Sequence, residues 1–140
     1  MNYVEAFIAI AEDCPVDHGV VPETKPGKKP TIAAIQYALL ADAPYVYTQE
    51  DVLFHTYAQT RAIPQDELAA RGPALRAAFF AKPQACLRAS PLAKQYGWGF
   101  HFDADGKVAL YPRESDEYRA FADNESGTLK VMKAFRSRRA

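Results

Sequence analysis

The sequence has little cysteine, no excess of charge and no long apolar run. Its 140 residues include two cysteines, Cys14 and Cys86, and its 17 basic residues balance 17 acidic residues. Two isolated cysteines form neither a disulfide framework nor a C-x-x-C redox or zinc motif, which favours reduced thiols in a cytosolic protein. Zero net charge argues against a dedicated nucleic-acid-binding protein, whose domain is usually strongly basic. The apolar run at residues 6–11 is too short for a signal peptide or a membrane span, so we expect no membrane association.

The length fits one ordinary globular domain over residues 1–140. A chain of this size buries roughly 68% of its unfolded surface, which is enough for a core without metal or disulfide support. The three histidines, His18, His55 and His101, are far apart in the sequence, and residues 103–106 lack the later ligands of a calcium loop. We therefore expect no metal site and no cofactor.

Alternation of apolar and other residues predicts a β-hairpin. Three aromatic residues alternate with smaller or polar ones over residues 98–102, and apolar residues alternate again over residues 108–111, after an Asp-Gly turn. This pattern predicts a hairpin over residues 98–111. A short apolar run at residues 4–10 predicts a buried strand. With the helical segments below, the pattern predicts an α+β fold in which helices pack on a small antiparallel sheet that includes the hairpin.

Side chains that can cap a helix precede four of the segments with helical spacing. These residues are Thr31, Thr48, Ser90 and Ser115. We expect a helix to begin after each of them, because a hydroxyl oxygen can accept a hydrogen bond from the first turn. Pro91 strengthens the prediction at Ser90, since proline is favoured at the first helical position.

Three other segments are read from proline and from residue spacing. Residues 44–48 are predicted to be extended, since they combine a proline with β-favouring residues. The helix that follows Pro64 is predicted to break at Gly72, with a new helix beginning at Pro73. Residues 128–135 fit helical spacing, and a strand is the competing interpretation.

Residues 84–102 lie inside a segment without acidic residues. Between Glu67 and Asp103 the chain has five basic residues and no acidic one, a segregation that attracts anions. A helix start after Ser90 would add free N–H groups and the positive end of the helix dipole, where phosphates and carboxylates bind. The leading hypothesis is non-catalytic binding of a small anionic molecule or an anionic group of a partner. The candidate ligand-binding residues are Arg88, Ser90, Lys94, Tyr96, Trp98, His101 and Arg113.

Two functional alternatives stay open. One is a small enzyme that uses Cys86 as a thiol nucleophile and His101 as its base, since an adjacent imidazole activates a thiol. The other is a protein-interaction or homodimerisation module, which would present an exposed aromatic face around Trp98 and Tyr111.

A structural interpretation competes with all three functions. In it, Ser90 is only a helix cap, Arg88 pairs with a carboxylate and Trp98 fills the core. The basic segment at residues 130–139 has one aromatic residue, Phe135, and no recognised nucleic-acid-binding motif, so we expect a helix end there rather than a nucleic-acid-binding surface.

Several blocks of the sequence resemble a known family. The blocks are residues 44–48 (PYVYT), 86–92 (CLRASPL) with 96–99 (YGWG), and 108–111 (VALY) with 113–115 (RES). Through them the chain is similar, over nearly its whole length, to a family of short bacterial and fungal proteins classed as a domain of unknown function. The resemblance implies no activity and no site residue, because the family has none assigned. The last thirty residues are also similar, through common residue types, to the C-terminal half of bacterial frataxin-like iron-chaperone domains.

Overall fold

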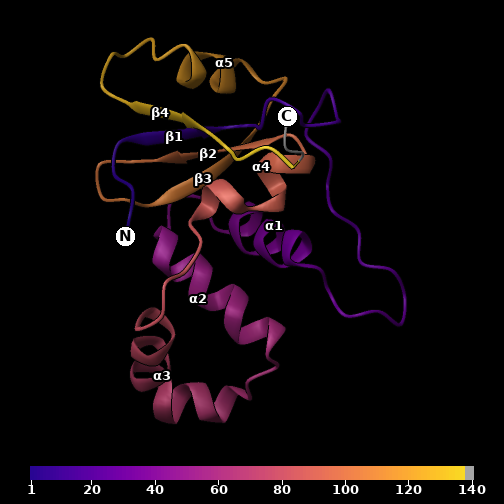
Figure 1. The fold of residues 1–140 in the computed structure, drawn as a ribbon, viewed down its shortest axis with the longest axis vertical. Helices are drawn as coiled ribbons and strands as arrows, with labels where there is room; N and C mark the ends of the chain where they lie inside the picture. Colours follow the sequence, from indigo (N-terminus) through magenta and orange to yellow (C-terminus); the bar gives the residue numbers. More distant parts are fainter. Residues whose placement is uncertain (138–140) are drawn as a thin grey trace.

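A computed structural model, which describes residues 1–137, contains a four-stranded mixed sheet. The strands lie in the order β3-β2-β1-β4 (Figure 1). Their bounds are Ala6–Ala9 for β1, Trp98–Phe102 for β2, Val108–Pro112 for β3 and Lys130–Lys133 for β4. β2 pairs antiparallel with β1 and β3, whereas β1 and β4 are parallel. The α+β class is confirmed, and the small sheet predicted as antiparallel is mixed, because β4 pairs parallel with β1.

The predicted hairpin is confirmed, and a short polar turn closes it. The Asp103 carboxylate accepts hydrogen bonds from the N–H groups of Asp105 and Lys107. Gly106 has a φ of +77°, a conformation that glycine adopts without steric cost. Local turn chemistry therefore fixes the pairing of β2 with β3.

The predicted helix over residues 128–135 is wrong, and the competing strand is confirmed. β4 lies beside β1, with Val131 opposite Phe7. Leu129 packs in the apolar cluster of Phe7, whereas Met132 packs on the other face of the sheet. The open side of β1 needs a hydrogen-bonding partner, and this tertiary requirement outweighs the helical spacing of one short segment. Residues 138–140, the end of the predicted basic tail, lie outside the described residues.

Helices cover both faces of the sheet and also extend away from it (Figure 1). One face carries α1 (Ile32–Asp42), α4 (Pro91–Gln95) and the 3₁₀ turn η1 (Leu87–Ala89), and the other carries α5 (Asp116–Ala122). The helices α2 (Gln49–Thr60) and α3 (Gln65–Phe80) form a projecting unit. We call residues 49–80 the arm and the rest of the described chain the body. No helix within residues 1–137 is long and apolar enough to cross a membrane.

The four predicted caps are confirmed. The hydroxyls of Thr31 and Ser115 accept hydrogen bonds from the N–H groups three residues further on, and the Ser90 hydroxyl accepts from the N–H of Leu92. Thr48 and Asp51 form a reciprocal capping box at the start of α2. Each cap satisfies an N–H group that the helix itself leaves unpaired.

Residues 44–46 form a turn, whereas Thr48 is extended and makes an antiparallel bridge with Lys107, so only the end of the predicted extended segment is confirmed. Tyr45 has a φ of +59°. Its N–H donates to the carbonyl of Val108, and the carbonyl of Tyr47 accepts from the N–H of Val108. The turn therefore covers the outer edge of β3, and this pairing holds Tyr45 in a backbone conformation that its propensity disfavours.

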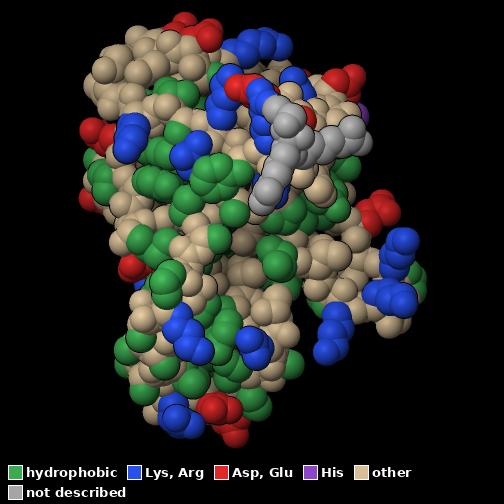
Figure 2. All heavy atoms as spheres, viewed as in Figure 1, with side chains coloured by type: hydrophobic (Ala, Val, Ile, Leu, Met, Phe, Trp, Pro, Cys, Tyr) green, Lys and Arg blue, Asp and Glu red, His purple; other side chains and the backbone are tan. Residues whose placement is uncertain are grey.

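The arm helix α3 is continuous, so the predicted break at Gly72 and Pro73 is wrong. Pro73 lies inside the helix, and the ribbon bends sharply within α3 (Figure 1). Proline removes one helical N–H and clashes with the preceding turn, which explains the bend. None of the residues of α3 is buried. Figure 2 shows the arm as a lobe at the bottom of the molecule, on which hydrophobic side chains lie among basic and acidic ones.

Two apolar clusters hold the body together. The larger one fills the space between the sheet and helices α1 and α4, and includes Ile8, Phe100 and Leu92. The smaller one lies under α5 around Phe7. Gly99 lies below the ring of α5's Tyr118, and a Cβ atom at position 99 would lie 2.5 Å from Phe7 Cζ and 2.8 Å from Tyr118 Cε2. Glycine is therefore what allows α5 to approach this face of the sheet.

Candidate functional site

Ser90, the centre of the predicted anion site, is buried and fully engaged within the chain. Only 4% of the residue is exposed. Its oxygen accepts from the N–H of Leu92, and its hydroxyl donates to Gln36 Oε1 at 2.6 Å. Because α4 has five residues, its start contributes only a small dipole field. Ser90 therefore acts as a helix cap and as part of a buried polar chain.

The other predicted anion ligands do not converge. The Arg88 Nε donates to the carbonyl of Lys133 at 2.7 Å, and its guanidinium lies 4.4 Å from the ring centre of Phe135. Arg113 donates to the carbonyl of Val16. These two arginines tie separate parts of the body together rather than sharing one site.

Three more candidates lie around the larger apolar cluster. Trp98 donates through its indole N–H to the carbonyl of Val20 at 2.8 Å, and Tyr96 packs beside it against the core. Lys94 is half-exposed on α4. The anion site stays a prediction, and the structure gives most of its residues separate partners within the chain.

The structure does not bring Cys86 and His101 together, because the two residues lie on opposite faces of the sheet. His101 stacks on Phe121 of α5, with ring centres 3.9 Å apart. Cys86 lies beside Tyr3, whose ring packs edge-on against Phe102 on the other face. Burial, together with the hydrogen bond to Cys86, raises the pKa of Tyr3 to about 12. An imidazole on the far side of the sheet cannot activate the thiol.

His101 belongs instead to a small network of aromatic side chains. Its Nδ1 lies 2.8 Å from the hydroxyl of Tyr45, which lies 2.7 Å from the hydroxyl of Tyr111. Burial lowers the pKa of His101, and the charge of Asp103 partly opposes this shift. The network fastens the turn at residues 44–46 to the sheet. In the part of the chain that the structure describes, no three His, Cys, Asp or Glu side chains could hold a metal ion.

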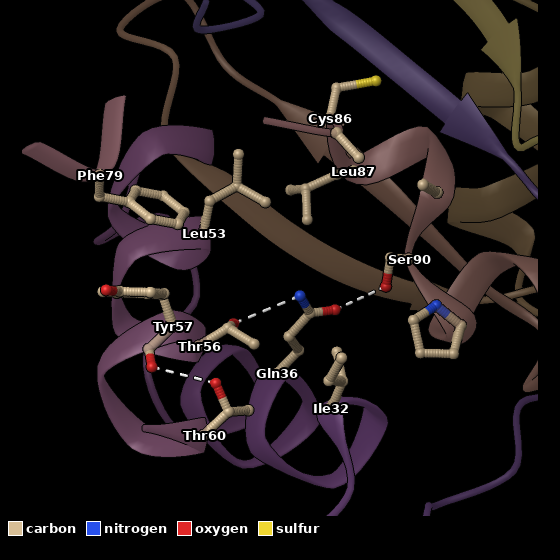
Figure 3. Close-up of a pocket in the computed structure, with 13 residues that line it drawn as sticks. Ile32, Gln36, Leu53, Thr56, Tyr57, Thr60, Phe79, Cys86, Leu87 and Ser90 are labelled. Carbon is tan, nitrogen blue, oxygen red and sulfur yellow. Dashed lines mark hydrogen bonds between the residues drawn. The ribbon is translucent and has the colours of Figure 1, made fainter. Parts of the chain in front are cut away.

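A pocket of about 250 Å³ that is open to solvent, called the cavity below, lies between the body and the arm (Figure 3). Its walls come from α1, from α2, from the C-terminal end of α3 and from residues 85–91. None of the residues that line it, all within the described chain, carries a charge. The cavity is lined by Ile32, Gln36, Leu53, Thr56, Tyr57, Thr60, Phe79, Ala85, Cys86, Leu87, Ala89, Ser90 and Pro91. It thus combines apolar walls with a few polar groups, the usual composition of a small-molecule site.

Three of the polar side chains, Gln36, Thr56 and Ser90, form one hydrogen-bonded chain centred on Gln36, a residue that is 3% exposed. Ser90 donates to Gln36 Oε1, and Gln36 Nε2 lies 3.3 Å from Thr56 Oγ1. The Thr56 hydroxyl itself donates to the carbonyl of Val52 at 2.7 Å. Since the Thr56 hydrogen is used, its oxygen must accept from Gln36, and the orientation of the amide is fixed. Figure 3 shows the amide between Thr56 and Ser90, with the Cys86 thiol pointing away from it.

A buried glutamine holds one wall of the cavity in place. Gln49 is fully buried at the start of α2, and its Oε1 accepts from the N–H of Leu87 at 2.8 Å. This bond satisfies the first N–H group of η1, which has no helical partner. It also joins the arm to residues 85–91, so both walls keep their spacing.

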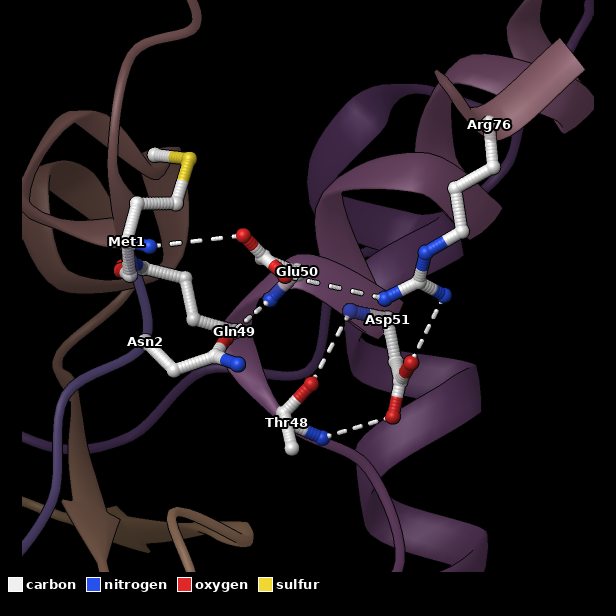
Figure 4. Close-up of polar contacts among 7 residues, drawn as sticks. All are labelled: Met1, Asn2, Thr48, Gln49, Glu50, Asp51 and Arg76. Carbon is white, nitrogen blue, oxygen red and sulfur yellow. Dashed lines mark hydrogen bonds and ion pairs between the residues drawn. The ribbon is translucent and has the colours of Figure 1, made fainter. Parts of the chain in front are cut away.

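An ion pair holds the other wall (Figure 4). Arg76 of α3 donates to Asp51 at 2.8 Å, lies 3.9 Å from Glu50, and places its guanidinium 5.5 Å from the ring centre of Phe80. Burial raises the pKa of Asp51, but the Thr48 N–H and Arg76 outweigh it, so the net pKa is lowered. The charged form of Asp51 thus serves both the capping box and the attachment of α3.

The sequence pointed to one of the segments that line this cavity and not to the others. Residues 85–91 belong to the stretch predicted to carry the site, whereas Gln36, Leu53 and Thr56 were missed because they lie far from it in the sequence. One signal was present: Gln36 follows Ile32 by four residues, so a polar side chain lies on the apolar stripe of a predicted helix.

These features define an α+β protein with an uncharged, mostly apolar cavity at the junction of a sheet-containing body and a helical arm. The chain belongs to a family of unknown function, DUF6157, whose model matches residues 1–140. The resemblance to such a family is thereby confirmed, and the similarity to frataxin-like domains stays a prediction. Searches of curated proteins and of solved structures found no match.

Proposed function

We propose that this protein binds a small, neutral and largely apolar molecule in the cavity between the body and the arm. The observation that carries the proposal is the lining, in which apolar side chains surround a buried amide and no residue is charged. An apolar cavity of about 150 Å³ can hold benzene. A space of about 250 Å³ therefore suits a ligand somewhat larger than benzene.

The uncharged lining decides the charge of the ligand. A carboxylate or phosphate that enters an apolar cavity loses its hydration, and this loss is compensated only by a charged or hydrogen-bonding partner. Since none of the lining residues is charged, an anion has only neutral hydrogen-bond donors here and no cation to offset this loss. The proposed ligand therefore differs from the anionic one that the sequence suggested, although residues 85–91 take part in both.

Affinity in this cavity comes mainly from burial of apolar surface. Burial contributes roughly 25 cal/mol per Å², so about 150 Å² of ligand surface contributes roughly 4 kcal/mol. That free energy corresponds to a dissociation constant of about 1 mM for a benzene-sized probe. Larger ligands that reach the arm aromatics Tyr57 and Phe79 should bind more tightly.

The test is a thermal-shift screen of neutral aromatic fragments against the wild type and Ala85→Trp. Ala85 lines the cavity but is itself exposed, so an indole at this position can fill the cavity without disturbing the core. Ala41→Trp is the matched control, because Ala41 is exposed on α1 and does not line the cavity. We expect fragments that stabilise the wild type and Ala41→Trp but not Ala85→Trp. The proposal is wrong if no neutral fragment stabilises the wild type or if Ala85→Trp responds equally.

A further inference from the structure

One hydrogen of the buried polar chain is left without an acceptor. The hydrogens of Ser90 and Thr56 go to Gln36 Oε1 and to the Val52 carbonyl, respectively. Gln36 Nε2 carries two hydrogens, and one of them points to Thr56. No other hydrogen bond of Nε2 occurs within residues 1–137, although 97% of the residue is shielded from solvent.

The second Nε2 hydrogen is directed toward the cavity. Gln36 lines the cavity, and the amide lies below Leu53 and Leu87 in Figure 3. Because Thr56 takes one hydrogen, the planar amide group must aim the other about 120° away from it. A buried N–H group without an acceptor raises the free energy of the protein, and a ligand that supplies an acceptor removes this cost upon binding.

We infer that the ligand of this cavity carries an uncharged hydrogen-bond acceptor, such as the carbonyl oxygen of an aryl ketone, aldehyde or amide, and that Gln36 selects it. This inference rests on the proposed function. An acceptor is favoured over a donor because the side-chain oxygens of Gln36, Ser90 and Thr56 each accept a hydrogen bond already. The second Nε2 hydrogen of Gln36, by contrast, has no partner within residues 1–137. An uncharged acceptor is favoured over a carboxylate because no cation lines the cavity within the described chain.

The test compares ethylbenzene with acetophenone, two probes of nearly the same shape of which only acetophenone has a carbonyl group. Their dissociation constants are measured for the wild type and Gln36→Met, whose side chain has a similar length and no N–H group. We expect Gln36→Met to weaken acetophenone about tenfold, the value of one ordinary hydrogen bond, and to change ethylbenzene by no more than about twofold. Gln95→Met, at an exposed position outside the cavity, should change neither.

A measurement on the wild type guards against a Gln36→Met variant that does not fold. In ¹H–¹⁵N spectra, acetophenone should move one of the two Nε2 proton signals of Gln36 downfield, and ethylbenzene should not. If neither probe binds saturably, the proposed function itself fails. If both probes bind but Gln36→Met affects them equally, or the Nε2 signal responds to both alike, the inference about the acceptor is overturned and the binding function stands.

Discussion

In the body, the strands and the helices packed on them bury whole side chains such as Phe7 and Phe100, whereas in the arm no residue of α3 is buried. The body is held by nonpolar packing on both faces of a hydrogen-bonded sheet. In the arm, half-buried aromatic rings and Arg76 hold α3 against α2. The arm is joined to the body by Val52 of α2, which packs in the larger apolar cluster, and by the bond from Leu87 to Gln49. The cavity lies where these two kinds of packing meet. A small protein can therefore keep a stable core and still leave space for a ligand, provided that a few contacts hold its less tightly packed part in place.

The largest expected effect is a difference in the free energy of unfolding that is lost when a ring is removed from the body or from the arm. Phe100→Ala removes a ring that is fully buried in the body and should lower the free energy of unfolding by about 3–5 kcal/mol. Phe80→Ala removes a half-buried ring of the arm and should cost only about 1 kcal/mol. Urea unfolding followed by circular dichroism measures both. Equal losses would mean that the arm is packed as firmly as the body.

The next effect lies at the junction. Gln49→Leu keeps the side-chain volume but leaves the buried N–H of Leu87 without an acceptor, which should cost about 1–3 kcal/mol. Gln65→Leu makes the same change at an exposed position of α3 and should stay within about 0.5 kcal/mol of the wild type. Urea unfolding followed by circular dichroism measures the free energy of unfolding of both variants. A Gln49→Leu variant as stable as Gln65→Leu would show that the bond does not hold the junction.

A smaller effect should appear only in the arm. Arg76→Met removes the ion pair with Asp51, whose two side chains are 37% and 28% exposed, so the global loss should be about 1 kcal/mol or less. Amide hydrogen exchange in α3 should nevertheless become faster, while exchange in the sheet stays unchanged. Arg71→Met, which breaks an exposed pair with Glu67, is the control and should leave both unchanged. Faster exchange throughout the molecule would argue against an arm that opens independently.

The smallest effect is a pH dependence that the two regions share. Burial lowers the pKa of His101 in the body and of His55 in the arm. The unfolded chain therefore takes up protons first as the pH falls below about 6.5, so stability present above that pH is lost below it. Unfolding midpoints at pH 7.5 and pH 5.5 should differ less in His101→Gln and in His55→Gln than in the wild type. An unchanged difference in both variants would assign the pH dependence to other groups.

The parts of the fold that the sequence predicted are those set by local interactions. The caps at Thr31, Thr48 and Ser115 and the turn at Gly106 depend on residues a few positions away, so their patterns could be read directly. β4 was misread because its conformation depends on β1, more than 120 residues earlier in the chain. The turn around Tyr45 was missed for the same reason, since its conformation depends on pairing with β3.

The site divides in the same way. The stretch at residues 84–102 drew attention through its charge, but Arg88 donates to the carbonyl of Lys133. Arg71 and Arg76, which belong to the same basic segment, pair with carboxylates of the arm. The cavity depends on Gln36, Thr56 and Ser90, which come from three separate segments and meet only in the folded chain. The spacing of residues in the sequence does not show that three distant segments come together, unless their residues match a known motif.

The most direct test of a ligand site between body and arm is a ¹H–¹⁵N NMR titration of the wild type with ethylbenzene. A site between body and arm predicts saturable shifts confined to amides that line the cavity or lie next to its lining residues, on α1, on α2, at the C-terminal end of α3 and at residues 85–91. The same shifts should occur in Ala41→Trp and be absent in Ala85→Trp. Shifts that do not saturate, that map to the α5 face of the sheet, or that persist in Ala85→Trp would contradict it.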